Sequence, residues 1–278
     1  MLIFERPWTR QPQTVVKTRP NGFRHLIYGD KLGGVDGGVW TPTNAPPIAA
    51  TPVGLARQFT SASEQALTTQ ALSLVQTNIT LFGLVRRTTN AINCTIINIG
   101  ASSGNHRTLL YFATNSLAIF SGAGALTGQA TTGVDSYTNT TDYVAVVGRV
   151  FSSTSRSVWA KLQNGTLLTG SNNGGVVSPS APSKVSVGGY WNDGALVGGF
   201  YMQGFIAAAG IIPFAISDTQ AIGLLNDLNG WAQWLQPRRI PIPTPAAAGY
   251  THPTLSLATA IDVTATSFKP RVTYTFPS

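Results

Sequence analysis

Short runs of β-forming residues, separated by clusters of Gly, Asn and Ser, fill the sequence from Thr51 to about Ile212. Several runs alternate between apolar and polar residues, as in the stretch from Tyr143 to Val150. This period of two is what a strand with one buried face produces, and many short strands at regular spacing are typical of an all-β sandwich. The pattern predicts strands at Leu55–Phe59, Ile79–Arg86, Cys94–Ile99, Thr108–Ala113, Ser116–Phe120, Tyr143–Phe151, Ser155–Leu162, Thr166–Thr169, Lys184–Gly188 and Phe200–Ile212.

Two local signals refine this prediction. Asn164-Gly165 lies between two strand-like runs and favours a β-hairpin with a type I′ turn. One short helix is predicted after the last strand, from Ser217 to about Asn229, because Ser217 and Gln220 have the spacing of a capping box and apolar residues recur at helical spacing. Asn229-Gly230 is expected to end this helix.

The net charge of +8 is concentrated at the two ends of the chain. Residues 1–31 carry +4, residues 32–237 carry +1 and residues 238–278 carry +3. The terminal basic residues alternate with prolines, which favour extended chain. We therefore predict an extended basic N-terminal arm (1–50), a β-sandwich (51–237), and a Pro-rich linker with a C-terminal β-arm (238–278).

The arms are predicted to bind neighbouring subunits of an assembly. The candidate contact residues are Arg6, Trp8, Arg10, Lys17, Arg19, Arg24, Arg238, Arg239 and Arg271. The alternating segment from Arg271 to Phe276 is too short for a stable sheet, so it is expected to add a strand to a neighbour. A homo-oligomer, taken as a trimer, is expected. Nucleic-acid binding is a minor alternative, because a nucleic-acid-binding domain collects its basic residues on the folded body.

The residue types that catalysis and zinc binding need are sparse. The two glutamates, Glu5 and Glu64, lie far apart, and no predicted strand carries two acids at i and i+2, so the carboxylate pair of a retaining glycosidase is not expected. Three scattered His residues and one Cys, Cys94, lack zinc-ligand spacing, and Cys94 is expected to be buried in a strand. No apolar run reaches the roughly 18 residues of a membrane helix. A non-enzymatic protein without a resident cofactor and without membrane insertion is expected.

Two ligand sites remain as alternatives at the rim of the sandwich. Asp135, Asp142 and Asp193 are candidates for a calcium ion, although each is also explained as a turn residue. Tyr190 and Trp191, next to Asp193, are the aromatic residues best placed to stack on a sugar. Packing within the loop is the competing explanation for both rings.

The order of features from residue 53 to residue 239 resembles concanavalin A-like and laminin-G-like jelly-roll domains of tailed-bacteriophage structural proteins. The segments that carry the resemblance are Gly54–Phe59, Gln163–Gly165, Val187–Tyr190, Phe200–Ala207, Ala215–Asp218 and Trp231–Arg239. The resemblance implies a jelly-roll β-sandwich in a non-enzymatic accessory virion protein, either a tail component or a head decoration, which is made in the bacterial cytoplasm and assembles through its arms. The alternative is a carbohydrate-binding module that recognises host-surface glycans through Tyr190, Trp191 and Asp193.

Overall fold

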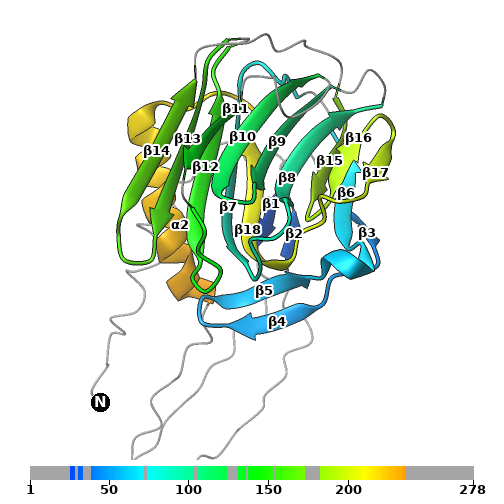
Figure 1. Cartoon of the computed structure of the whole chain (residues 1–278), viewed down its shortest axis with the longest axis horizontal. Helices are drawn as coiled ribbons and strands as arrows, with labels where there is room; N and C mark the ends of the chain where they lie inside the picture. Colours follow the sequence, from blue (N-terminus) through cyan, green and yellow to red (C-terminus); the bar gives the residue numbers. More distant parts are fainter. Residues whose placement is uncertain are drawn as a thin grey trace, which may run out of the picture. The chain divides into compact units, whose positions relative to one another are not determined.

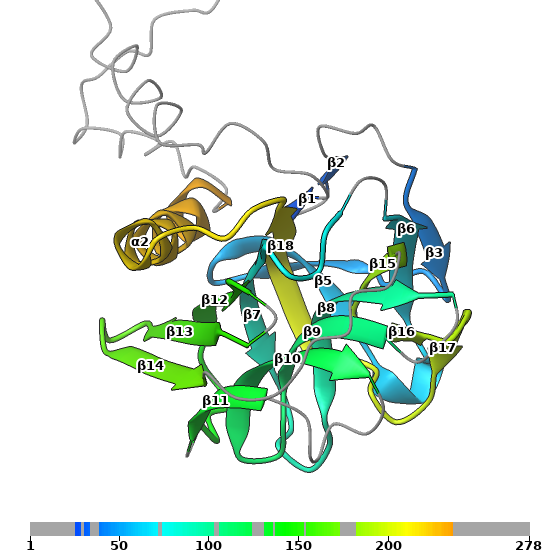
Figure 2. The same ribbon diagram turned by 90° about the horizontal axis from the view of Figure 1, so that it is seen from above.

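The computed structural model describes residues 26–28, 31–33, 39–71, 74–102, 106–123, 131–135, 137–152, 154–172 and 182–235. Their strands form two antiparallel sheets, which we call sheet A and sheet B (Figures 1 and 2). Sheet A contains β1 (Leu26–Tyr28), β2 (Lys31–Gly33), β4 (Ile48–Thr51), β5 (Gly54–Phe59), β7 (Ile79–Arg87), β12 (Val144–Val150), β13 (Arg156–Leu162), β14 (Leu167–Asn172) and β18 (Gly204–Ile212). Sheet B contains β3 (Thr41–Thr43), β6 (Ala66–Gln70), β8 (Cys94–Ala101), β9 (His106–Phe112), β10 (Ser116–Ala123), β11 (Thr131–Asp135) and β15 (Pro182–Val187).

Strands that are distant in the sequence lie side by side in both sheets. Sheet A has the order β14-β13-β12-β7-β18-β1-β2, with β5 paired to β18 and β4 paired to β5. Sheet B has the order β11-β10-β9-β8-β15-β6-β3. The remaining elements are the 3-10 helix η2 (Ser61–Ser63), the hairpin of β16 (Tyr190–Asn192) and β17 (Ala195–Val197), and the helix α2 (Asp218–Leu235).

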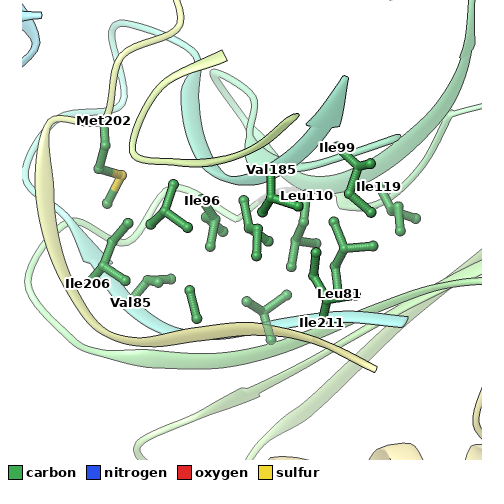
Figure 3. Packing of buried hydrophobic residues seen from close by; sticks show 14 of the residues in the cluster. Leu81, Val85, Ile96, Ile99, Leu110, Ile119, Val185, Met202, Ile206 and Ile211 are labelled. Atoms are coloured by element: carbon green, nitrogen blue, oxygen red, sulfur yellow. The ribbon is translucent and has the colours of Figure 1, made fainter. Parts of the chain in front are cut away.

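The main hydrophobic core lies between the two sheets. Leu81 and Val85 from sheet A and Ile99 and Leu110 from sheet B are fully buried there, and Figure 3 shows them facing one another. Burial of each such side chain contributes about 1.5–3 kcal/mol relative to leaving it in water. Cys94 belongs to the same core, which confirms its predicted burial.

All ten predicted strands are present, with ends that differ from the predicted ones by up to four residues. The boundary predicted at residue 51 is wrong, because strands within the predicted N-terminal arm are paired into the sandwich. Leu26 of β1 is opposite Gly210 of β18, and Thr41 of β3 is opposite Thr68 of β6. Residues 1–25 and the whole C-terminal arm lie outside the described residues.

The hairpin between β13 and β14 is confirmed, but its turn differs from the predicted one. The Leu162 amide donates to the Thr166 carbonyl (2.9 Å) and the Gly165 amide donates to the Leu162 carbonyl (3.0 Å), so the loop has three residues. Of the loop residues Gln163, Asn164 and Gly165, only Gly165 has a positive φ, at 87°. A type I turn followed by one left-handed glycine is the usual geometry of a three-residue hairpin loop, whereas type I′ needs positive φ at two positions.

The start of α2 is the predicted capping box. The Ser217 amide donates to Gln220 Oε1 (2.8 Å), and the Gln220 amide donates to Ser217 Oγ (3.2 Å). The helix runs on to Leu235, so the predicted end at Asn229-Gly230 is wrong. Gly and Asn in a helix cost on the order of 1 kcal/mol or less per residue, which tertiary context routinely overrides.

α2 packs on the outer face of sheet A. Ala221, Leu224, Leu225 and Leu228 form a second apolar cluster with outward-facing residues of β7, β12, β13 and β18. Figure 2 shows the helix beside β12 and β13, with β14 farther away at the end of the sheet. Among the described residues, no helix combines the length and the apolar character needed to cross a membrane.

Candidate functional site

The residues predicted to bind glycans lie on the β16–β17 hairpin, which packs on the outer face of sheet B next to β8, β9 and β15. Asn192 is paired with Ala195, and between them Asp193 and Gly194 have φ angles of 49° and 88°. Positive φ at both loop residues is the geometry of a type I′ turn, in which Asp-Gly is a preferred pair. Asp193 is therefore accounted for as a turn residue, in agreement with the competing explanation from the sequence.

Tyr190 does not offer an exposed ring to a sugar, as the glycan alternative required. The residue is 4% exposed, and its ring lies 5.1 Å from the Phe200 ring in a tilted arrangement. The Arg107 guanidinium lies 5.2 Å from the Tyr190 ring centroid on another side. Burial raises the pKa of the Tyr190 phenol to about 12. The aromatic ring is used to attach the hairpin to sheet B.

Trp191 is half-buried and also holds the hairpin in place. Its backbone amide donates to Asn98 Oδ1 (3.0 Å), and its backbone and ring lie directly against Gly100. A Cβ at Gly100 would lie 2.2 Å from the Trp191 carbonyl oxygen, so only glycine allows this approach. The Lys184 ammonium lies 5.9 Å from the indole centroid. Because Tyr190 and Trp191 are consecutive in a strand, they face opposite sides and do not form one stacking surface.

The other predicted site residues have different outcomes. The nine arm residues lie outside the described part of the chain, so their role stays a prediction. Asp142 accepts hydrogen bonds from Asn139 Nδ2 (3.0 Å) and Thr141 Oγ1 (3.3 Å), which is typical of a turn. Among the described residues, no three His, Cys, Asp or Glu side chains gather where they could hold a metal ion. The calcium alternative also stays a prediction.

A different surface has the properties of a binding site. An open groove of about 310 Å³ lies on the outer face of sheet A, beside the first turn of α2. We call it the β13–β14 groove. Its lining residues are Ser157, Trp159, Thr169, Gly170, Ser171 and Asp218.

The strand register explains why these side chains meet. Ser157 is directly opposite Ser171, and Trp159 is directly opposite Thr169. Residues that are opposite in an antiparallel pair share one face, so all four point away from the core. α2 packs over β5, β7, β12 and β13, whereas β14 is the last strand of sheet A. Thr169 and Ser171 therefore remain exposed.

Arg149, on β12, forms one border of the groove and is held by several partners. Its Nη1 lies 2.7 Å from Asp218 Oδ1 and donates to the Ile216 carbonyl (2.8 Å). Its Nη2 donates to Ser157 Oγ (3.3 Å). The guanidinium also lies 4.8 Å from the Trp159 ring centroid, a cation–π distance. These contacts connect the helix start to the sheet and fix the carboxylate of Asp218 at the groove.

The groove is suited to a ligand with many hydroxyl groups. The hydroxyls of Ser157, Thr169 and Ser171 can each donate and accept a hydrogen bond. The side chain of Asp218 is 72% exposed and accepts hydrogen bonds in a charge-assisted way. Trp159 is 5% exposed, so little of the indole is available to stack on a ligand.

The sequence did not predict this groove, although one of the two features that form it is visible in the local residue pattern. The alternation in β13 and the Thr and Ser residues of β14 indicate a polar outer row on a strand pair. The second feature is the position of α2, which begins about 50 residues after β14 and leaves that polar row uncovered. No local pattern specifies which strands a later helix covers.

Comparisons with known proteins bear on the fold. No protein-family model matches the sequence, and it matches no curated protein. The structure is similar to domain 4 of AbnA, a GH43 extracellular arabinanase from Geobacillus stearothermophilus, in complex with arabinotriose. The TM-score is 0.53 at 15% identity, over 73% of this chain and 99% of that domain.

Two further structures have lower similarity. The binding domain of Paraclostridial Mosquitocidal Protein 1 has a TM-score of 0.49 at 11% identity, over 73% of this chain and 51% of the other. The Ruminococcus gnavus IT-sialidase CBM40 bound to alpha2,3 sialyllactose has a TM-score of 0.43 at 12% identity, over 53% of this chain and 82% of the other. Over its described residues the chain is an all-β jelly-roll sandwich with one α-helix, as predicted, and it shares its fold with domain 4 of the arabinanase.

Proposed function

We propose that the chain is a carbohydrate-binding domain that holds an oligosaccharide in the β13–β14 groove without catalysing a reaction on it. The observation that carries this proposal is the combination of an open groove, three hydroxyl side chains and one exposed carboxylate on a rigid sheet. The arabinanase domain of the same fold, which is in complex with arabinotriose, supports the same class of ligand.

The chemistry of the groove matches that of a sugar. Each sugar hydroxyl is both donor and acceptor, and the Ser and Thr hydroxyls of the groove can meet it in either sense. Asp218 adds an acceptor whose hydrogen bonds contribute about 1.5–3 kcal/mol each, against about 0.5–1.5 kcal/mol for neutral partners. Because association itself costs several kcal/mol, a Kd of about 0.1–1 mM is expected.

The test is glycan binding by the full chain, first on a glycan array and then by calorimetry with any oligosaccharide that binds. Thr169→Arg places a long charged side chain in the groove from an exposed strand position, and it should weaken binding at least tenfold. Thr41→Arg makes the same change at an exposed position of β3, in sheet B, and should leave binding intact. Absence of glycan binding, or equal binding by both variants, would overturn the proposal.

The predicted role as an accessory virion protein is a separate matter. It depends on arm residues that lie outside the described part of the chain, so it stays a prediction. Truncation of residues 1–25, which leaves the paired strand β1 in the sandwich, should release the protein from a particle, and unchanged incorporation would contradict the role of the arm.

A further inference from the structure

The charged groups at the β13–β14 groove are Asp218 and Arg149, which pair with each other, and Lys161, which keeps its positive charge because its partner is a neutral amide. Asp218 lines the groove and Arg149 borders it, and their side chains form an ion pair with an N–O distance of 2.7 Å. Lys161 follows Trp159 at i+2 on the same face of β13, and its Nζ is bonded to Asn226 Oδ1 of α2. The cations on this side of the groove therefore already have partners.

Arg149 has little capacity left for a charged ligand. Its Nη1 serves Asp218 and the Ile216 carbonyl, one N–H of its Nη2 serves Ser157, its Nε is buried, and its Cζ lies 4.8 Å from the Trp159 ring centroid. Its side chain is only 12% exposed, whereas that of Asp218 is 72% exposed. A ligand that enters the groove therefore meets the negative member of the pair first.

We infer that the groove selects uncharged oligosaccharides and rejects carboxylated or sulfated ones. A ligand carboxylate would lie close to Asp218, which lines the groove, whereas Lys161 is not among the lining residues, and like charges at close range are unfavourable. Hydroxyl groups, in contrast, can donate to the Asp218 carboxylate and accept from the side-chain hydroxyls. This inference rests on the proposed function and specifies its ligand class.

The net charge of the chain makes the inference testable against a simple alternative. A protein with a charge of +8 attracts anionic ligands over its whole surface, and this attraction is long-ranged at low ionic strength. At about 0.15 M salt the screening length falls to about 8 Å, so the local groups dominate. Bulk charge predicts preference for acidic sugars, whereas the ion pair predicts preference for neutral ones.

The first experiment compares paired oligosaccharides that share a backbone and differ only in charge. Suitable pairs are the methyl ester of sialyllactose with free sialyllactose and methyl-esterified with free trigalacturonate, placed on an array at 0.15 M salt with other neutral and sulfated pairs. The expected result is at least tenfold tighter binding of the neutral member in every pair that binds. Equal or tighter binding of the charged member, weakened in the uncharged variant Thr169→Met, would overturn the charge selection and leave the proposed function intact. Binding of neither member in any pair would overturn the proposed function and the selection with it.

The second experiment changes the selectivity itself. Asp218→Asn removes the carboxylate and releases Arg149 Nη1, so affinity for a carboxylated sugar should rise about tenfold while affinity for the neutral member falls. Glu64→Gln removes one negative charge at an exposed position in the turn after η2 and serves as the matched control. An equal gain in affinity for the carboxylated sugar in Asp218→Asn and Glu64→Gln would show an effect of net charge alone. It would overturn the role of the Arg149–Asp218 ion pair in selectivity.

Discussion

The outer faces of the two sheets differ in how they are covered. On sheet B, the β16–β17 hairpin and Phe200 cover an aromatic cluster that includes Tyr190. On sheet A, α2 covers the apolar centre, and the β13–β14 groove lies at the edge of the sheet next to its first turn. A binding site is therefore expected on the part of a sheet face that no helix or hairpin covers. It is not expected simply where the sequence has the most aromatic residues.

The largest effect on stability is expected from displacing the β16–β17 hairpin from the outer face of sheet B. Gly100→Ala places a Cβ 2.2 Å from the Trp191 carbonyl oxygen and 2.9 Å from its Cδ1, so the hairpin backbone has to move. A loss of about 1–3 kcal/mol in the free energy of unfolding is expected, measured by urea denaturation. Gly198→Ala is the control, because a Cβ there meets no atom within 4 Å. Equal stability of both variants would mean that the hairpin does not close this face.

A smaller loss of stability is expected at alkaline pH. The buried phenol of Tyr190 has a pKa of about 12, whereas an exposed phenol has a pKa of about 10. As the pH rises, the unfolded chain loses this proton before the folded protein does. The contribution of the protonated phenol to the free energy of unfolding is therefore complete below pH 10 and is lost as the pH rises through 12. At pH 11 the expected loss is about 1.4 kcal/mol.

The measurement is the difference between wild type and Tyr190→Phe in unfolding free energy at pH 8 and pH 11. Other tyrosines whose pKa is raised by burial, such as Tyr137, act in both proteins and cancel in the comparison. If the two proteins had the same pH dependence, the Tyr190 ring would be open to solvent and available to a ligand. That outcome would remove the contrast between the two faces.

The smallest effect on stability is expected on sheet A. Ser171→Ala removes one exposed hydroxyl from the groove and should change the unfolding free energy by less than about 0.5 kcal/mol. Glycan binding should weaken about threefold to tenfold, since one neutral hydrogen bond is worth about 0.5–1.5 kcal/mol. Ser63→Ala, an exposed serine in η2, should alter neither quantity. A large loss of stability in Ser171→Ala would contradict an open groove.

The sequence predicts the parts of this molecule that depend on neighbours along the chain. Alternation located the long strands, and the Ser217–Gln220 spacing located the start of α2. The short strands β1–β4 were missed, because three or four residues carry too little periodicity to be recognised. β1 and β3 are strands because the distant strands β18 and β6 pair with them, and β2 and β4 pair in turn with their neighbours β1 and β5.

The site depended on contacts that no local pattern encodes. Tyr190 is an aromatic residue next to a polar loop, as a sugar-stacking residue would be. In the folded protein, however, Arg107 and Phe200, which come from other parts of the chain, pack against its ring and bury it. The sequence places Asp218 only in the first turn of the predicted helix. Its pairing with Arg149, 69 positions earlier, places it at the groove.

The start of α2 also has a consequence for the thermodynamics of binding. Ile216 is held by Thr80 and Arg149 before Asp218, and the Gln220 amide after it donates to Ser217 Oγ, so the backbone on both sides of Asp218 is fixed in the folded protein. Ordering one residue costs roughly 1–2 kcal/mol of conformational entropy, and here that cost falls on folding and not on binding. A ligand therefore finds a carboxylate that is already oriented, and its affinity depends on how well it replaces the water molecules there.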